Sequence, residues 1–215
     1  YQKWSPMELV ETALSHPVNS PPGASWSYSN TNYILLGLII EKVTGHTLGY
    51  EIRKRIIQPL GLDNTCFPNS PGIPGRHAKG YISYGGFWMD VSAVDPSIGW
   101  ASSAMISNVL DLKVWAEVLA NGALLSPELG AERLQFVPSR ATPGYAGYLG
   151  YGLGIMRMGN FIGHYGCAFG YSCLMYHLPS SGATFVVVMN SSTDNGEAAT
   201  RLFVDLASAL YPDAL

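Results

Sequence analysis

The chain has 215 residues, of which 47% are hydrophobic and 13% are charged, and this balance excludes an intrinsically disordered polypeptide. Its formal net charge is −3, without a block of like charges, which argues against nucleic-acid binding. The apolar run at residues 33–40 is far shorter than the about 20 residues that a membrane-spanning helix needs.

Helix signals dominate the first half of the chain. Ser5 and Glu8, on either side of Pro6, form the sequence pattern of a capping box at a helix start. Apolar residues at helical spacing followed by Gly45 predict a second helix, and a third is expected to end before Pro59. The expected helices span about residues 5–16, 31–44 and 48–57, and loops with short strands, rich in Gly, Pro and aromatic residues, are expected over about 63–95.

The pattern changes from helices to strands toward the end of the chain. Ser107 and Ser126 each predict the start of a helix, and short apolar segments separated by Gly, Pro and Ser predict strands. Ser180-Ser181-Gly182 predicts a hairpin turn, and Asn195-Gly196-Glu197 opens a closing helix. The expected helices span about residues 108–120, 126–136 and 195–210, and the expected strands span 148–158, 160–164, 171–177 and 184–190.

This order of elements predicts an α+β fold, with a helical region beside an antiparallel sheet that carries a helix on its face. We expect a single domain over residues 1–215. Its helical region with loops would cover about 1–145, and its sheet and closing helix about 146–215.

Two short segments carry polar groups that can line a cleft. Tyr28-Ser29-Asn30 stands on the turn before a strongly apolar helix. The alternative interpretation is an ordinary helix cap, with Ser29 or Asn30 as the N-cap and Tyr28 as a packing residue. His164 lies between Gly163 and Gly166, which favours a strand edge lining a cleft.

The segment from Trp26 to Gly45 resembles the class C β-lactamase and D-alanyl-D-alanine carboxypeptidase family of penicillin-recognising serine hydrolases. The similarity extends, in the family's order, over 57–62, 106–112, Tyr151-Gly152-Leu153-Gly154, Gly163-His164-Tyr165-Gly166 and Gly170-Tyr171. It covers the chain from about Glu8 to the final helix, and it is most similar to the secreted actinomycete carboxypeptidase branch. The resemblance implies a β-lactamase/transpeptidase-like fold whose N-terminal strands and nucleophile helix are absent here, and a secreted or periplasmic location.

The resemblance implies roles for the residues of the first segment. Tyr28 corresponds to a catalytic acid/base, and Asn30 to an asparagine that hydrogen-bonds the amide side chain of the substrate. A phenol with a pKa near ~10 is a poor base at neutral pH unless a neighbouring cation favours its ionised form. Trp100 falls where the carboxypeptidases carry a cleft tryptophan, although a purely structural aromatic residue is equally expected there.

His164-Tyr165-Gly166 matches the family's third motif, Lys/His-Thr-Gly. The resemblance implies that His164 supports the catalytic tyrosine or a proton relay. By the same analogy, Tyr165, Gly166 and Cys167 border the substrate, and the backbone N–H of Cys167 is one oxyanion-hole donor. Losing one such donor typically costs ~3 kcal/mol of transition-state stabilisation.

The family's nucleophile, the serine of Ser-x-x-Lys, has no counterpart in these 215 residues. The residues three positions before Lys42, Lys54, Lys79 and Lys113 are Ile39, Glu51, Arg76 and Leu110, and Lys3 has no such position. The chain also opens on Tyr1 without a starting Met, so we expect a cut or truncated sequence. We therefore expect the nucleophile outside this chain, and we expect this chain alone to be inactive.

A second departure concerns the substrate. The carboxypeptidase branch has Thr-Gly-Thr after its catalytic His, where this chain has Tyr165-Gly166-Cys167. Its carboxylate-binding arginine corresponds to Met156, with Arg157 one position on, and a one-residue shift along a strand points to the opposite face. Most groups that bind a free carboxylate are therefore missing. An esterase, amidase or aminopeptidase is favoured over a carboxypeptidase or β-lactamase.

Two functions remain open. The first is a serine hydrolase acting by acyl transfer on a small-molecule or peptide substrate; the second is a non-catalytic binding or scaffold remnant of the same fold. We expect no cofactor, because the five histidines lack metal-ligand spacing and no phosphate-binding glycine loop is present. The other expected partner is the missing N-terminal segment or a second copy, because loss of that segment leaves an unpaired strand edge.

The chain has three cysteines, Cys66, Cys167 and Cys173. So few cysteines in a chain of this length do not form a disulfide scaffold. Cys167 and Cys173 either face one another across two strands or are separate buried thiols.

Overall fold

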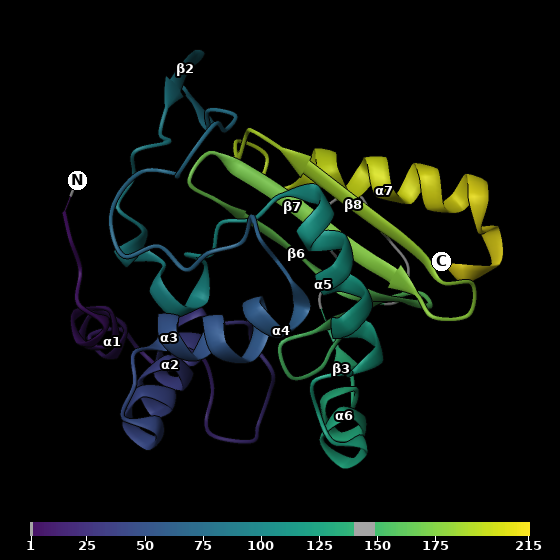
Figure 1. Cartoon of the computed structure of the whole chain (residues 1–215), viewed down its shortest axis with the longest axis horizontal. Helices are drawn as coiled ribbons and strands as arrows, with labels where there is room; N and C mark the ends of the chain where they lie inside the picture. Colours follow the sequence, from purple (N-terminus) through teal and green to yellow (C-terminus); the bar gives the residue numbers. More distant parts are fainter. Residues whose placement is uncertain (1, 140–148) are drawn as a thin grey trace. The chain divides into compact units, whose positions relative to one another are not determined.

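The computed structural model describes residues 2–139 and 149–215 (Figure 1). The described residues form two compact units. The first contains the residues up to His77 together with Ala93–Ser107, and the second contains Ala78–Ser92 together with the residues from Asn108 onward. The boundary expected near residue 145 lies outside the described residues. In the described part of the chain, no helix combines the length and the apolar character needed to cross a membrane.

Helices joined by turns make up the first unit. α1 begins with the predicted capping box, because the Ser5 hydroxyl accepts the Glu8 N–H and the Glu8 carboxylate accepts the Ser5 N–H. α2 ends as predicted at Gly45, which is left-handed with a φ of 71°. The elements are α1 (Pro6–Leu14), α2 (Asn30–Thr44), α3 (Leu48–Ile52), the π-helical turn η1 (Arg53–Ile57), α4 (Gln58–Leu60), and the 3-10 turns η2 (Pro96–Ile98) and η3 (Trp100–Ser102).

The prediction that the third helix ends before Pro59 is wrong. α3 continues through η1 into α4, so helical turns extend to Leu60. Pro59 directly follows the π-helical turn, as the second residue of α4, and only one further helical residue comes after it. Gly61, left-handed with a φ of 61°, ends the helix.

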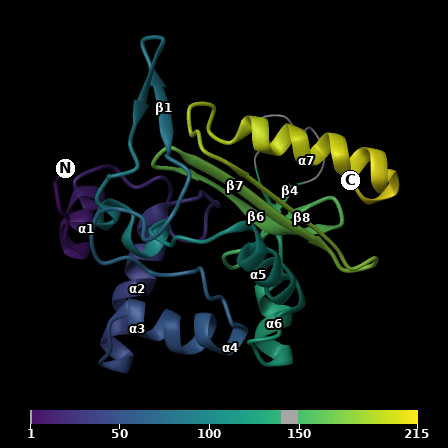
Figure 2. The same cartoon turned by 45° about the horizontal axis from the view of Figure 1, so that its top comes forward.

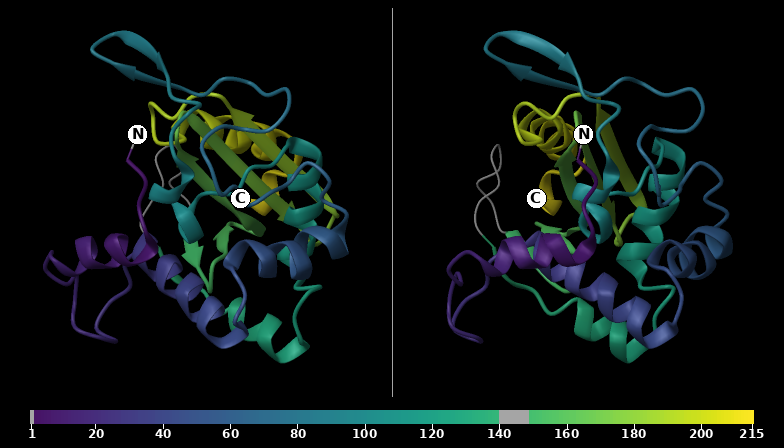
Figure 3. Two further views of the ribbon diagram at one scale, coloured as in Figure 1. Left: turned by 60° about the vertical axis from the view of Figure 1, so that its left-hand side comes forward. Right: turned by 90° about the vertical axis from the view of Figure 1, so that its left-hand side faces the viewer.

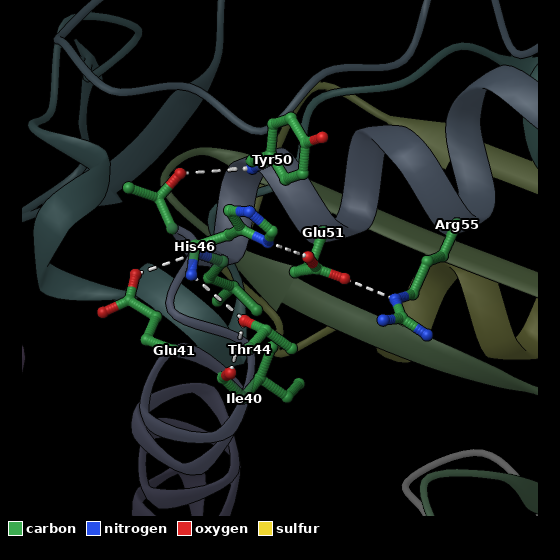
Figure 4. Close-up of polar contacts among 9 residues, drawn as sticks. Ile40, Glu41, Thr44, His46, Tyr50, Glu51 and Arg55 are labelled. Carbon is green, nitrogen blue, oxygen red and sulfur yellow. Dashed lines mark hydrogen bonds and ion pairs between the residues drawn. The ribbon is translucent and has the colours of Figure 1, made fainter.

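A buried carboxylate closes the turn between α2 and α3 (Figure 4). Glu51 is 4% exposed; its Oε1 lies 2.8 Å from Nδ1 of His46, and its Oε2 accepts a hydrogen bond from Nε of Arg55. The bond from Arg55 holds the pKa of the Glu51 carboxyl below its ordinary value. The Glu41 carboxylate adds a second link, because it accepts the N–H of Leu48 at 2.8 Å. Such pairing is what allows a charged group to be buried.

The second unit is built on an antiparallel sheet with the strand order β3-β4-β5-β6-β7-β8. Helix α5 packs on one face of the sheet and helix α7 on the other (Figures 1 and 2). The strands are β3 (Val137–Pro138), β4 (Leu149–Tyr151), β5 (Met156–Met158), β6 (Phe161–Ala168), β7 (Tyr171–Leu178) and β8 (Ala183–Met189), and the helices are α5 (Val109–Asn121), α6 (Pro127–Arg133), α7 (Glu197–Leu210) and the 3-10 turn η4 (Pro212–Ala214).

Three details of this unit differ from the predictions. The strand expected at 148–158 is two strands, because the chain reverses between Gly152 and Ile155, where Gly154 has a φ of 67°; residue 148 itself lies outside the described part. The N-cap of α5 is Asn108 rather than Ser107, and its side chain accepts a hydrogen bond from the helix at 2.9 Å. The two-residue strand β3 is too short to show a period of two, so no signal predicted it. The hairpin turn predicted at Ser180-Ser181-Gly182 is confirmed between β7 and β8.

The sheet face that α7 covers holds the main apolar core. Phe161, Tyr176 and Phe203 are each 0% exposed. The ring centroid of Phe203 lies 5.2 Å from that of Phe161, edge to face, and 5.0 Å from that of Tyr176, nearly parallel. Aromatic pairs in these arrangements contribute about 0.5–1.5 kcal/mol each beyond their buried area. This packing fixes β6, the strand that carries the second predicted motif.

Strands β1 (Tyr81–Tyr84) and β2 (Phe87–Asp90) form a separate hairpin that projects from the end of the sheet (Figure 3). Gly85 and Gly86 have φ values of 59° and 84°, as the favoured two-residue hairpin turn requires at both positions. Backbone hydrogen bonds from Tyr81 tie the base of the hairpin to the sheet. Its most exposed aromatic side chains are those of Tyr84, Phe87 and Trp88.

Candidate active site

The Tyr28-Ser29-Asn30 segment lies at the N-terminus of α2, in the first unit. Ser29 is the N-cap, and its hydroxyl accepts the N–H of Thr31 at 3.3 Å. Asn30 is the first helical residue, and the side chains of Tyr28 and Asn30 are exposed. The Tyr28 ring lies 5.8 Å from the Tyr33 ring. The cap interpretation therefore accounts for Ser29, and it leaves Tyr28 and Asn30 at the surface, where a substrate could touch them.

Trp100 is held against the middle of α2. Its φ of 37° is unusual for a non-glycine residue and marks local backbone strain. A Cβ added at Gly37 would lie 2.8 Å from Cζ3 of Trp100 and 2.7 Å from the Cβ of Ala101. The indole therefore approaches α2 at a point that only glycine leaves open. A glycine inside an apolar helix is a sequence signal that could have indicated this contact. The substrate contact predicted for Trp100 stays a prediction.

His164 lies on β6 in the second unit, inside a short hydrogen-bonded chain. Its Nδ1 is 2.6 Å from the carbonyl oxygen of Tyr165, and its Nε2 is 3.1 Å from the hydroxyl of Tyr151. A carbonyl oxygen only accepts, so the proton is assigned to Nδ1, and Nε2 accepts the proton of the Tyr151 hydroxyl. Burial lowers the pKa of His164 below its ordinary value, so the imidazole is neutral at pH 7.

Gly163, the residue before His164, allows β6 to lie close to β7. A Cβ at Gly163 would lie 1.9 Å from the carbonyl oxygen of Met175 on β7. Only glycine fits this approach, because the obstructing atom belongs to the backbone. The His164 ring also lies 6.2 Å from the Tyr165 ring and nearly parallel to it. The imidazole thus has an aromatic ring on two sides, that of Tyr151 and that of Tyr165.

The other residues of the predicted motif lie beside the start of α7. A Cβ at Gly196 would lie 3.8 Å both from the Cβ of Cys167 and from Cδ2 of Tyr165. Tyr165 packs against the apolar core, and the Cys167 thiol is 3.5 Å from the carbonyl oxygen of Ser192. Gly166 contributes backbone only. Any substrate contact by Tyr165 or Cys167 would therefore use backbone groups, and the roles of these three residues stay predictions.

The two cysteines of the sheet do not face one another. In the register of β6 and β7, Cys167 pairs with Ser172 and Cys173 pairs with Gly166. This offset of one residue places the two thiols on opposite faces, because side chains alternate along a strand. All three cysteines are free, and burial is the main cause that raises the pKa of each thiol. They are therefore separate thiols, as the second interpretation expects, although each is only partly buried, and a raised pKa disfavours the reactive thiolate.

The side chains of Met156 and Arg157 have different surroundings, as expected for neighbouring residues that point to opposite faces of a strand. Met156 is 4% exposed and belongs to the core on the α7 side. Arg157 pairs with Ile162 instead, and its guanidinium donates to the carbonyl oxygen of Gly159 at 2.7 Å and to Asn160 Oδ1 at 3.2 Å. The arginine therefore binds the β5–β6 turn, and the position that corresponds to the family's carboxylate-binding arginine holds an apolar side chain.

Known proteins resemble the chain over almost its whole length. Residues 1–209 match the β-lactamase family. The D-aminopeptidase of Brucella anthropi is 26% identical over 191 residues, which are 84% of this chain and 34% of that protein. The D-stereospecific amidohydrolase from Streptomyces sp. has a TM-score of 0.84 at 32% identity, over 98% of this chain and 62% of that one. The D-amino acid amidase from Ochrobactrum anthropi SV3, complexed with L-phenylalanine amide, has a TM-score of 0.80 at 25% identity, over 97% of this chain and 65% of that one.

The chain thus spans about a third of the curated relative and less than two thirds of the two solved structures. TM-scores of 0.80–0.84 confirm the predicted α+β, β-lactamase/transpeptidase-like fold. The match over residues 1–209 confirms the resemblance that the ordered motifs predicted. This chain belongs to the β-lactamase family of penicillin-recognising hydrolases.

Proposed function

We propose that the protein containing this chain is a serine hydrolase that cleaves an amide or ester through an acyl-enzyme, with its nucleophilic serine outside these 215 residues. The observation that carries the proposal is the likeness of 98% of the chain to a D-stereospecific amidohydrolase. Tyr28 would act as acid/base and His164 in proton handling. Asn30 and Trp100 would contact the substrate, as would the β6 backbone at 165–167.

The substrate class follows from what surrounds His164. The next three positions offer the packed ring of Tyr165, no side chain at Gly166, and a thiol directed at a carbonyl oxygen at Cys167. Gly166 and Cys167 carry no hydroxyl, the only hydroxyl of the three is the phenol of the packed Tyr165 ring, and the Arg157 guanidinium binds a turn. A substrate without a carboxylate beside its scissile bond fits better than a peptide ending in D-alanine. We infer an amide or ester of a D-amino acid; the relatives are named as a D-aminopeptidase, a D-stereospecific amidohydrolase and a D-amino acid amidase.

The test uses the whole protein with four probes: D-phenylalanine amide, its L-enantiomer, a peptide ending in D-Ala-D-Ala, and a fluorescent penicillin. We expect ammonia release from the D-amide at least tenfold faster than from the L-amide, and little hydrolysis of the peptide. Tyr28→Phe should lower kcat/KM by about 10²–10⁴, the usual contribution of a general acid or base. Tyr33→Phe, which removes the hydroxyl from the neighbouring ring, is the control, and its kcat/KM should stay within about threefold of wild type. Absence of turnover and of acylation with all probes would overturn the proposal.

The alternative is a non-catalytic binding or scaffold protein of the same fold. Its support is the lack of a Ser-x-x-Lys sequence among the 215 residues. The coding sequence before Tyr1 separates the two functions. A Ser-x-x-Lys encoded there excludes the scaffold interpretation, and its absence from the whole protein excludes the acyl-enzyme.

The second unit also offers a surface for the part of the protein that the relatives have and this chain lacks. Leu202, Leu206 and Leu210 form an exposed row on α7, and among the described strands β8 pairs only with β7. An open strand edge and an exposed apolar row are both sites of association. The match covers 62% and 65% of the two solved relatives, so more than a third of each lies outside it. We therefore propose that a further segment of the same protein covers this surface.

Sedimentation of the whole protein and of the 215-residue chain tests this assignment. We expect the chain alone to self-associate and the whole protein not to do so through this surface. Leu206→Lys should reduce self-association of the chain alone, whereas Arg201→Lys on the same helix should not. A monodisperse 215-residue monomer with a cooperative melting transition would contradict the proposal.

A further inference from the structure

The hydroxyl of Tyr151 forms a contact with His164 that the motif comparison did not assign. Tyr151 is the last residue of β4 and is 6% exposed, and β5 separates β4 from β6 in the sheet. Its hydroxyl lies 3.1 Å from Nε2 of His164. The two rings meet edge to face, with centroids 5.7 Å apart and planes at 83°. The contact is therefore both a hydrogen bond and a packing contact.

The two ring nitrogens of His164 have different partners. The Tyr165 carbonyl oxygen can only accept, so it holds a proton on Nδ1. The free lone pair of the neutral ring is then on Nε2, directed at the Tyr151 hydroxyl. Rotating the imidazole by half a turn would place ring carbons against both partners and lose both hydrogen bonds. The pair of partners thus selects one tautomer and one ring orientation.

We propose that Tyr151 is a positioning residue, which fixes the tautomer and the ring orientation of His164 by donating a hydrogen bond to its Nε2. The inference rests on the proposed function, in which His164 takes part in proton handling. In this arrangement the Tyr151 hydroxyl occupies the Nε2 lone pair, so Nε2 accepts a proton from another group only when that hydrogen bond is exchanged, and the bond fixes the orientation from which the ring acts. Tyr151 acts through His164 and is not itself assigned a contact with the substrate.

The variant Tyr151→Phe removes the hydroxyl and retains the ring, so the edge-to-face packing survives. Nitrogen-15 spectra of the histidine side chains in the whole protein give a readout that does not depend on turnover, and a His164→Gln sample identifies the His164 signals. We expect wild-type Nδ1 to be the protonated nitrogen and Nε2 a hydrogen-bonded acceptor. In Tyr151→Phe, the Nε2 signal should move toward that of an acceptor without a partner, while Nδ1 stays protonated.

The kinetic counterpart is a loss in kcat with little change in KM. Removing one neutral hydrogen bond from an oriented base should lower kcat roughly tenfold. Tyr211→Phe removes a hydroxyl from a ring packed against the same core, and it is the matched control that should change neither the His164 spectrum nor kcat. Partial loss of folding in Tyr151→Phe would lower the amount of active protein, but it would not move the Nε2 signal of the folded fraction.

A His164 spectrum that is the same in wild type and Tyr151→Phe overturns the proposal, and so does a proton on Nε2 in the wild type. These outcomes are separate from the fate of the proposed function. If no acyl substrate is turned over, the hydrolase assignment fails, and the spectra still decide whether the Tyr151 hydroxyl holds the imidazole.

Discussion

The two units of the chain hold their candidate residues by different means. In the second unit, His164 lies in a strand backed by fully buried aromatic rings and hydrogen-bonds a second buried side chain. In the first unit, Tyr28 and Asn30 stand exposed at a helix end that a serine caps. The first unit also buries the Glu51 carboxylate against the more exposed side chains of His46 and Arg55, and its longest helix leaves much of its apolar surface exposed. From this difference we expect that shortening a buried apolar side chain lowers the free energy of unfolding most in the second unit. In the first unit, we expect stability to depend on the close packing at Gly37 and on the charge of Glu51.

Phe203→Ala should have the largest effect on stability. The ring is 0% exposed and contacts the rings of Phe161 and Tyr176. Emptying such a site removes buried surface and leaves a cavity, so we expect the free energy of unfolding to fall by about 3–5 kcal/mol. Asp205→Ala, at an exposed position of the same helix outside the row of leucines, is the control, and it should cost less than about 1 kcal/mol. Denaturant titration of the whole protein measures both, and equal losses would remove the contrast between the two faces of α7.

Gly37→Ala tests the first unit and should have an intermediate effect. The added methyl group would lie 2.7 Å from the Cβ of Ala101, which cannot rotate away, and 2.8 Å from the Trp100 ring. Overpacking of this kind costs about 1–3 kcal/mol, and the better helix propensity of alanine returns at most about 1 kcal/mol of it. Gly130→Ala, in α6 with open space around the new methyl, should instead stabilise the protein by about 0.5–1 kcal/mol. If thermal or denaturant unfolding shows that Gly37→Ala lowers stability and Gly130→Ala raises it, the contact of α2 with Trp100 and Ala101 is supported. Stability changes of the same sign in both variants contradict it.

Local signals in the sequence predicted the parts of the fold that neighbouring residues decide. The capping box at Ser5 and the left-handed Gly45 each depend on a few adjacent residues, and both are confirmed. The end of the third helix was missed because a π-helical turn places Pro59 in a position that tolerates it. The cap of α5 was missed by one residue, because Ser107 and Asn108 are both good caps.

The candidate site shows the same limit. Its motifs could be read along the chain, and the family resemblance that they predicted is confirmed. The contact between Tyr151 and His164 could not be read in this way, because it depends on the registers of β4, β5 and β6 together. The approach of β6 to β7 at Gly163 is likewise a property of two paired backbones. The sequence therefore indicated the family and a set of candidate residues, and the three-dimensional pairing shows how His164 is held.

The Glu51 carboxylate of the first unit should give the smallest effect, and one that depends on pH. The pKa of Glu51 is held below its ordinary value of 4.5, first by the bond from Arg55, so the ionised carboxylate favours the folded state. This contribution is fully present above the pKa of the unfolded chain and is lost as the pH falls through the lower folded value. Glu51→Gln should therefore be less stable than wild type near neutral pH, and the gap should narrow as the pH drops below about 4. Urea titrations across this range measure the gap, with Glu11→Gln on the exposed side of α1 as the control for loss of an exposed carboxylate. A gap that stays constant down to low pH would mean that Glu51 supports the turn by its shape and neutral hydrogen bonds rather than by its charge.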